Sequence, residues 1–173
     1  MNIAIIPARK NSIRIKNKNK RLFFQKPIIE YSILAAKNTK IFKFILISTD
    51  CNKIANIAKK AGVLVLKRSK KLSSNNVGIV EVVKDAILRL NRNNIFPKHV
   101  CCIFPAAPLI ESKKIVEGLK KIKKKKCNFI FSASKSNFDI FKSFNLSNKN
   151  YIKLLFKKNI INKHSNKDIL ILS

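Results

Sequence analysis

A basic loop directly follows the first apolar segment of the chain, in the stretch IIPARKNSIRIKNKN at residues 5–19. Its basic residues are Arg9, Lys10, Arg14, Lys16 and Lys18, and the polar residues between them are Asn11, Ser12, Asn17 and Asn19. Basic side chains offset phosphate charge, a guanidinium can donate to two oxygens at once, and hydroxyl and amide groups add hydrogen bonds. The loop therefore predicts a phosphate-binding site. The alternative is a solvated connector in a lysine-rich chain.

Strand-like and helix-like patterns alternate along the chain and would position this loop. Short segments that are apolar on both faces predict strands at 2–8, 42–49, 63–68, 99–104 and 128–134. Amphipathic segments predict helices at 26–38, 51–62, 77–90 and 111–126. In the third, apolar residues repeat with helical spacing at Val80, Val83, Ala86, Ile87 and Leu90. The alternation predicts an α/β fold, a mostly parallel sheet with helices on both faces. Beyond Lys135, FKSFNLS and YIKLLF predict a hairpin.

The carboxyl ends of the predicted strands define the place where a ligand would bind. Four segments would meet at this edge of the sheet, which we call the rim: 9–19, 48–50, 69–76 and 105–108. The basic loop lies at the rim, which favours the phosphate-binding interpretation. Asp50 lies there too, and its place before a helix that starts near Asn52 favours a helix N-cap over a metal ligand. For Arg68, ligand contact and a structural role both stay open.

Length, composition and charge limit the classes of protein to which this chain can belong. The 173 residues, long enough for one domain with a continuous core, include 38 basic and 8 acidic residues, a formal net charge of +30. The lysines are spread along the chain without the interleaved aromatic residues of a base-stacking surface, so a nucleic-acid partner is not expected. No segment approaches the roughly 20 apolar residues of a membrane span, and no basic region precedes the first apolar run as in a signal peptide. We expect a cytoplasmic protein with a single domain over 1–173.

Cysteine and histidine spacing does not predict a metal site. The four cysteines form no CxxC pair. Cys101 and Cys102 are adjacent in a predicted strand and would point to opposite faces, which predicts two small buried side chains rather than metal ligands or a disulfide framework. His99 and His164 lie far apart in the sequence, so zinc is not favoured.

Several segments together carry a resemblance to a known family. They are IIPAR with the following Ser12, Lys18 and Asn19, KP at 26–27, ISTD at 47–50, AKKAG at 58–62 and VCCIFPAAPLI at 100–110. In this order they resemble the acylneuraminate cytidylyltransferases, and the last segment is most similar to the pseudaminic acid branch. The resemblance covers roughly residues 1–168 in order, so it is far more specific than one loop.

The resemblance implies a Rossmann-like nucleotidyltransferase domain that transfers CMP from CTP to a nonulosonic acid, pseudaminic acid or a related sialic-acid-like sugar, and releases pyrophosphate. The sugar's anomeric hydroxyl would attack the α-phosphorus of CTP, with Mg²⁺ assisting, and a homodimer is also implied. Arg9 and Lys18 are the implied catalytic residues. The implied nucleotide-binding residues are Ala8, Arg9, Lys10, Asn11, Ser12, Lys18, Asn19, Ser74, Asn75, Pro105, Ala106 and Ala107.

Several positions depart from the family pattern. Lys10 and Asn11 replace two glycines, Gln25 replaces the glycine before KP, and Ala106 replaces a threonine. Glycine allows backbone conformations that other residues resist, so these changes bear on how the loop closes on phosphate. Asn75 is the nearest equivalent of the family's aspartate. An HDAG-like stretch, whose aspartate helps hold the metal in relatives, is not found, so we expect the chain to lack the family's C-terminal segment and assign no metal ligand.

Two other functions remain open. A catalytically impaired remnant of the family would bind CTP without releasing pyrophosphate. A nonspecific nucleic-acid binder, driven by the charge of +30, would ignore base identity and lose affinity steeply with salt. Arg14, Lys16 and Lys20 are expected to form a solvated face in either case.

Overall fold

The computed structural model describes residues 1–12, 15–125, 127–135, 144–146, 152–154 and 170–172. The contacts divide the chain into two compact units, 1–120 and 121–173. Each unit is described by itself, and the single domain over 1–173 stays a prediction. Arg14, Asp139, His164 and Asp168 lie outside the described residues.

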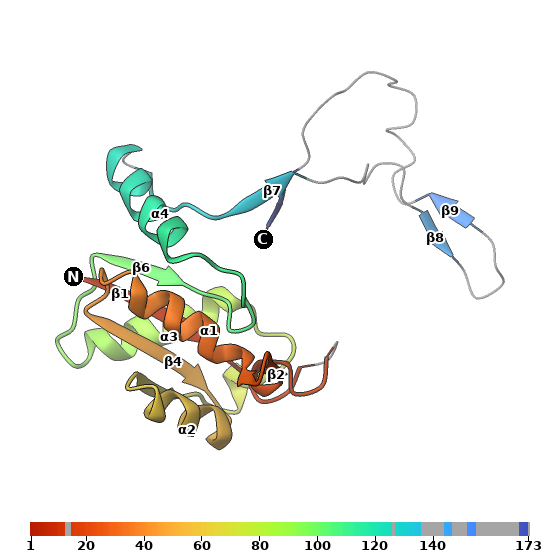
Figure 1. Cartoon of the computed structure of the whole chain (residues 1–173), viewed down its shortest axis with the longest axis horizontal. Helices are drawn as coiled ribbons and strands as arrows, with labels where there is room; N and C mark the ends of the chain where they lie inside the picture. Colours follow the sequence, from red (N-terminus) through yellow and green to blue (C-terminus); the bar gives the residue numbers. More distant parts are fainter. Residues whose placement is uncertain (13–14, 126, 136–143, 147–151, 155–169, 173) are drawn as a thin grey trace. The chain divides into compact units, whose positions relative to one another are not determined.

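A four-stranded parallel sheet forms the centre of the first unit, in the order β5-β4-β1-β6 (Figure 1). This arrangement confirms the predicted α/β fold. The strands are β1 (Asn2–Pro7), β4 (Phe44–Thr49), β5 (Leu64–Lys67) and β6 (His99–Cys102), and a short hairpin is made by β2 (Leu22–Phe23) and β3 (Lys26–Pro27). The helices are η1 (Lys18–Lys20), α1 (Ile28–Asn38), α2 (Asn52–Lys60), η2 (Lys71–Ser73), α3 (Ile79–Asn91) and α4, which begins at Ser112 and ends at Lys125.

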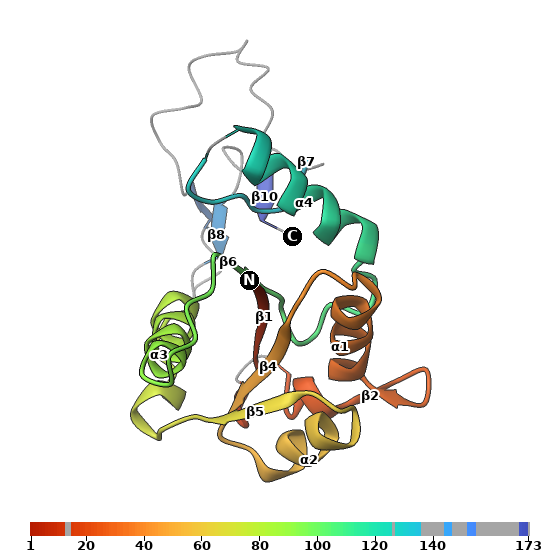
Figure 2. The ribbon, with the colours of Figure 1, turned by 90° about the vertical axis from the view of Figure 1, so that its left-hand side faces the viewer.

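Helices cover both faces of the sheet, with α1 and α2 on one face and α3 on the other (Figure 2). Successive residues of a strand point to opposite faces, so β1 and β4 contribute side chains to the core on both faces of the sheet. Ala4, Ile6 and Ile47 pack with α1 and α2, whereas Ile3 and Leu46 pack with α3. All five are buried, which explains why these strands are continuous apolar runs.

Helix α2 ends where the sequence predicts. Gly62 has a φ of +66°, the left-handed conformation that glycine adopts without a Cβ penalty. Its N–H donates to the Lys59 carbonyl at 2.9 Å, which satisfies one of the last carbonyls of the helix. The chain then turns directly into β5 and reaches the edge of the sheet.

Two local predictions were wrong, at Val80 and at Cys102. In α3, Ala86 and Leu90 of the predicted repeat are buried together with Val82. Val80 is 71% exposed, because it lies about 200° around the helix from Val82. Cys101 is half-buried, but Cys102 is exposed on β6, which is an edge strand, so only one face of this pair is well covered. Burial raises the pKa of the Cys101 thiol to about 11.

The second unit contains short antiparallel strands. The strand predicted at 128–134 begins only at Ala133, and β7 (Ala133–Lys135) pairs antiparallel with β10 (Leu170–Leu172). Phe129 and Phe131 precede it and are exposed, so their apolar alternation does not mark a buried strand here. β8 (Phe144–Leu146) and β9 (Ile152–Leu154) pair antiparallel, which confirms the predicted hairpin.

Within the described residues, no helix has the length and apolar content needed to cross a bilayer.

The turn of the β2-β3 hairpin places two residues with side chains in a glycine-like conformation. Phe24 and Gln25 have φ values of 42° and 65°. A two-residue hairpin turn of this kind prefers glycine, because an L-residue costs roughly 1–2 kcal/mol in the left-handed region. We therefore expect Gln25→Gly to raise the free energy of unfolding by about 1 kcal/mol, measured by urea denaturation.

The control for this prediction is Gln25→Ala, which removes the same polar side chain and keeps the Cβ. We expect this variant to unfold like the wild type. An equal gain for the alanine and glycine variants would show that the side chain, and not the backbone conformation, destabilises the turn.

Candidate functional site

The loop after β1 is fixed to the neighbouring strand where it leaves the sheet. Pro7 is in register with Ser48 of β4, and the Ala8 N–H donates to the Ser48 carbonyl at 2.9 Å. Ala8 is fully buried, and the half-buried Arg9 follows it at the rim. The backbone that leads into Arg9, the first charged residue of the loop, is therefore held in place.

The loop closes on its own beginning through Asn19. The Asn19 Nδ2 group donates to the Arg9 carbonyl at 3.0 Å, and the Asn19 side chain is buried. Asn17 enters η1 with a φ of 58°, a conformation that asparagine tolerates better than most residues. The structure thus brings Arg9 and Asn19 together, with Lys18 half-buried beside them. The Asn19 Oδ1 atom is buried and has no hydrogen-bond donor within the described residues.

Asp50 ties the loop to the end of β4. Its Oδ1 atom accepts a hydrogen bond from the Lys10 N–H at 2.6 Å. The N-cap of α2 is Cys51, and no side chain caps this helix, so the interpretation of Asp50 as an N-cap was wrong. Neither Lys10 nor Asn11 is among the residues with positive φ, so the loop follows this path without the glycine conformation that the family pattern suggests.

A buried guanidinium connects the next rim segment to β4. Arg68 is 7% exposed, and its Nη2 and Nε atoms donate to the Ser48 carbonyl at 2.7 Å and the Ser48 Oγ at 3.2 Å. Burial lowers the pKa of Arg68 from its ordinary value, and the charge of Asp50 opposes that shift. Arg9 Nη1 reaches the Ser74 carbonyl at 3.4 Å, so segment 69–76 contacts the basic loop. Ser74 and Asn75 are exposed.

The segment after β6 starts at the same edge. The Ile103 N–H donates to the Ile5 carbonyl at 3.0 Å, and Ser32 of α1 donates its hydroxyl to the Phe104 carbonyl at 2.8 Å. Pro105 is buried, and Ala106 and Ala107 are half-buried. In the strand order, β4 and β5 lie on one side of β1 and β6 on the other. The carboxyl ends of β1 and β6 therefore flank the topological switch point, where open α/β sheets bind their ligands.

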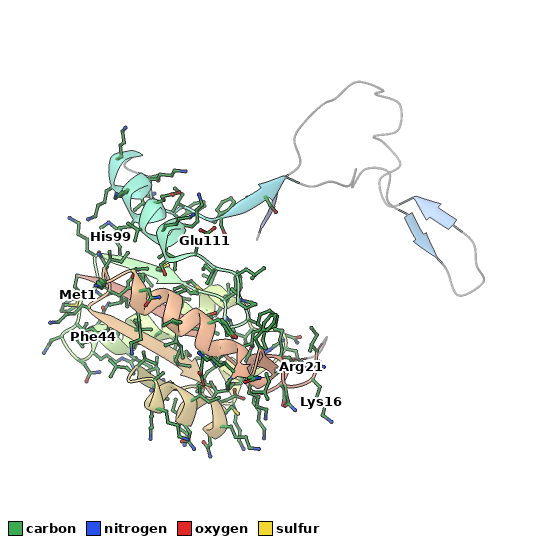
Figure 3. All side chains as sticks on the ribbon, viewed as in Figure 1. Met1, Lys16, Arg21, Phe44, His99 and Glu111 are labelled. Carbon is green, nitrogen blue, oxygen red and sulfur yellow. The ribbon has the colours of Figure 1, made fainter. Side chains whose placement is uncertain are left out.

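Two hollows open on the α2 side of the basic loop. The smaller has a volume of about 240 Å³ and is lined by Lys10, Lys20, Asp50, Cys51, Asn52 and Lys53. The larger adjoins η1 and includes Lys16 and Lys20 in its lining. The solvated face expected for these two lysines stays a prediction. Lys16 and Arg21 lie at the end of the first unit opposite to Met1 and Phe44 (Figure 3).

The residues that the structure describes do not form a metal centre. No group of three or more His, Cys, Asp or Glu side chains could hold a metal ion within them. Asp50 is a carboxylate at the rim, but one of its oxygens already accepts the Lys10 N–H. A magnesium ion bound by protein usually takes one or two carboxylates together with phosphates and water. The Mg²⁺ that the resemblance implies does not fit these residues, and no catalytic step is assigned to it.

Comparison with known proteins decides the family. The cytidylyltransferase family model matches residues 3–170. The chain belongs to the cytidylyltransferase family. The pseudaminic acid cytidylyltransferase of Campylobacter jejuni serotype O:2 is 34% identical over 158 residues, which cover 91% of this chain and 68% of that protein. The CMP-N,N'-diacetyllegionaminic acid synthase of the same strain is 42% identical over 88 residues, 50% of this chain and 37% of that protein.

Solved structures of the same fold agree with this assignment. The CMP:2-keto-3-deoxy-manno-octonic acid synthetase complexed with CTP has a TM-score of 0.62 and 13% identity, over 78% of this chain. This chain covers 51% of that protein. The likeness shows the fold, and it confirms the predicted Rossmann-like nucleotidyltransferase architecture. The predicted family and the predicted enzyme class, a CTP-dependent nucleotidyltransferase, are likewise confirmed.

Sequence patterns did not reveal how Asp50 and Arg68 hold this cytidylyltransferase rim together. Both residues directly follow strands, which is a signal that they lie at the rim. The partners could not be deduced, because the Lys10 N–H and the Ser48 carbonyl belong to segments 40 and 20 residues away. Arg68 has a structural role, since its guanidinium is anchored on β4.

We expect Arg68→Lys to lower the free energy of unfolding by about 2 kcal/mol, measured by urea denaturation. Lysine cannot donate in the forked geometry of a guanidinium, so the Ser48 carbonyl or hydroxyl would lose its partner inside the protein. The matched control is Arg89→Lys. Arg89 also donates to a backbone carbonyl, that of Lys67 at 2.7 Å, but it is partly exposed. Equal losses in the two variants would contradict the structural role of Arg68.

Proposed function

We propose that this chain transfers CMP from CTP to a nonulosonic acid of the pseudaminic or legionaminic type and releases pyrophosphate. The observation that carries the proposal is the closed basic loop at the switch point, in which Asn19 holds the Arg9 backbone. The relatives that carry these names are similar to the chain over 158 and 88 residues. We further propose that the protein acts in the cytoplasm, and as a homodimer.

The charge at the rim suits the triphosphate of CTP. Arg9 is half-buried and close enough to Arg68 for its charge to lower the pKa of Arg68. An anion near these two cations would reduce their repulsion, and the Arg9 guanidinium can donate to two phosphate oxygens. Lys18 would add a second phosphate contact from η1. Phosphoryl transfer depends mainly on positioning and charge stabilisation, which basic side chains on a fixed loop supply.

The Asn19 Oδ1 atom, which has no donor within the described residues, gives the proposal a second support. A buried acceptor without a donor costs roughly 1–3 kcal/mol, so such atoms are rare unless a ligand supplies the donor. The Asn19 Nδ2 group is used by the Arg9 carbonyl, which leaves the oxygen for another group. A ribose hydroxyl or the amino group of cytosine would satisfy it. Both groups belong to CTP.

The test of the proposed reaction is an assay of pyrophosphate release with CTP, Mg²⁺ and pseudaminic or legionaminic acid, together with titrations of CTP and ATP at low and high salt. We expect release that depends on the sugar, and a preference for CTP over ATP that persists at high salt. CTP binding without release would contradict catalysis and would support the impaired remnant. Binding that ignores the base and collapses with salt would contradict both and indicate a nonspecific polyanion binder.

We expect Asn19→Ala to weaken CTP binding by about tenfold or more, because it removes a buried hydrogen-bond acceptor and frees the Arg9 backbone. The measurement is CTP titration by calorimetry. Asn93→Ala is the control, because Asn93 Nδ2 also donates to a backbone carbonyl, that of Arg89 at 2.7 Å. Asn93 follows the end of α3 and precedes β6, so it lies near the amino ends of the strands and away from the rim. CTP affinity that falls equally in both variants, or in neither, would contradict the role of Asn19.

A further inference from the structure

A strongly basic hollow lies between η1 and α2, outside the residues proposed to bind CTP. We call it the α2 cleft. It is open, has a volume of about 610 Å³, and is lined by Lys16, Asn17, Lys20, Arg21, Lys53, Asn56, Ile57 and Lys60. Five of these eight residues are cationic, none is acidic and none is aromatic. A cavity lined in this way is suited to an anion.

The cleft is built by two elements that are packed against each other. On α2 the lining residues are Lys53, Asn56, Ile57 and Lys60, whose spacing places them on one helical face. The half-buried Ile57 packs against the core cluster, so the face is anchored by its apolar member and presents its lysines to the cleft. The opposite wall, from Lys16 to Arg21, is held by Asn19 within η1.

Within the described residues, no ion pair joins a cation of the cleft to a carboxylate. The ion pairs within the described residues are Arg89 with Asp85, Lys113 with Glu111 and Lys114 with Glu117, and all lie elsewhere. Segments 15–21 and 52–60 contain no Asp or Glu. Like charges gathered around one hollow repel each other, and the attraction of each cation to a bound anion would offset this repulsion.

We infer that the α2 cleft binds a compact anion that carries several phosphate groups, at a site separate from the proposed CTP site. A multiply charged oligophosphate can contact lysines on both walls at once, and the amides of Asn17 and Asn56 can donate to its remaining oxygens. The smaller hollow shares Lys20 and Lys53 with the cleft and continues to Lys10 at the start of the basic loop. The cleft is therefore continuous with the rim.

A polynucleotide fits the cleft less well than a small oligophosphate. Grooves for single strands combine a basic track with aromatic side chains on which bases stack, and the lining contains no aromatic residue. The cations surround one hollow rather than following a line across the surface. Nucleic-acid binding is therefore the competing outcome of the test.

The test uses sodium tripolyphosphate as the probe, titrated by calorimetry near physiological salt into the full chain. The double variant K53Q/K60Q removes two exposed charges from α2. We expect it to weaken tripolyphosphate binding at the cleft by about tenfold or more, because contacts between charged groups and phosphate typically contribute this much. The control K43Q/K84Q removes the same charge from exposed positions outside the cleft and should change the affinity by less than about twofold.

The outcomes separate this inference from the proposed enzymatic function. Loss of tripolyphosphate binding in K53Q/K60Q, with CTP binding kept, supports a second site even if no CMP transfer is found. Equal weakening in both double variants would show an effect of net charge and would overturn the inference, as would no weakening in either. A twenty-residue oligo-dT that displaces tripolyphosphate and binds the wild type more tightly would assign the cleft to nucleic acid and would also overturn it.

Discussion

The side-chain amide of Asn19, buried against the Arg9 carbonyl, is the interaction on which the rest of the site depends. It joins the two ends of the basic loop, so that the guanidinium of Arg9 and the ammonium of Lys18 stand on one closed turn. Without this bond the loop would leave β1 as a chain of mutually repelling cations. The same turn supplies Lys16, Asn17, Lys20 and Arg21 to the lining of the α2 cleft.

The parallel sheet supplies the platform for this closure. Adjacent strands end together, and hydrogen bonds from Ala8 and Arg68 to Ser48 fix two rim segments to the same residue of β4. Asp50 adds a third connection through the Lys10 N–H. A family whose reaction depends on positioning charge around a triphosphate needs this kind of fixed rim. At Lys10 and Asn11 the loop has no positive φ, so these two residues are accommodated without the left-handed conformation.

The sequence was sufficient to predict the sheet and the convergence of its loops, because doubly buried strands leave a strong apolar pattern and Gly62 marks a helix end. Arg9 and Asn19 could be paired through the family resemblance. The partners of Asp50 and Arg68 could not, since they depend on contacts between segments distant in the chain. The face of α3 was misassigned at Val80, which lies about 200° around the helix from the buried Val82. The α2 cleft required the packing of η1 on α2, which no local pattern encodes.

A structure of the protein bound to CTP tests the central claim most directly. The account predicts phosphate oxygens within hydrogen-bond distance of the Arg9 guanidinium, and a hydroxyl or amino group of the nucleotide donating to Asn19 Oδ1. A nucleotide bound at another edge of the sheet, with Asn19 Oδ1 still lacking a donor, would contradict it.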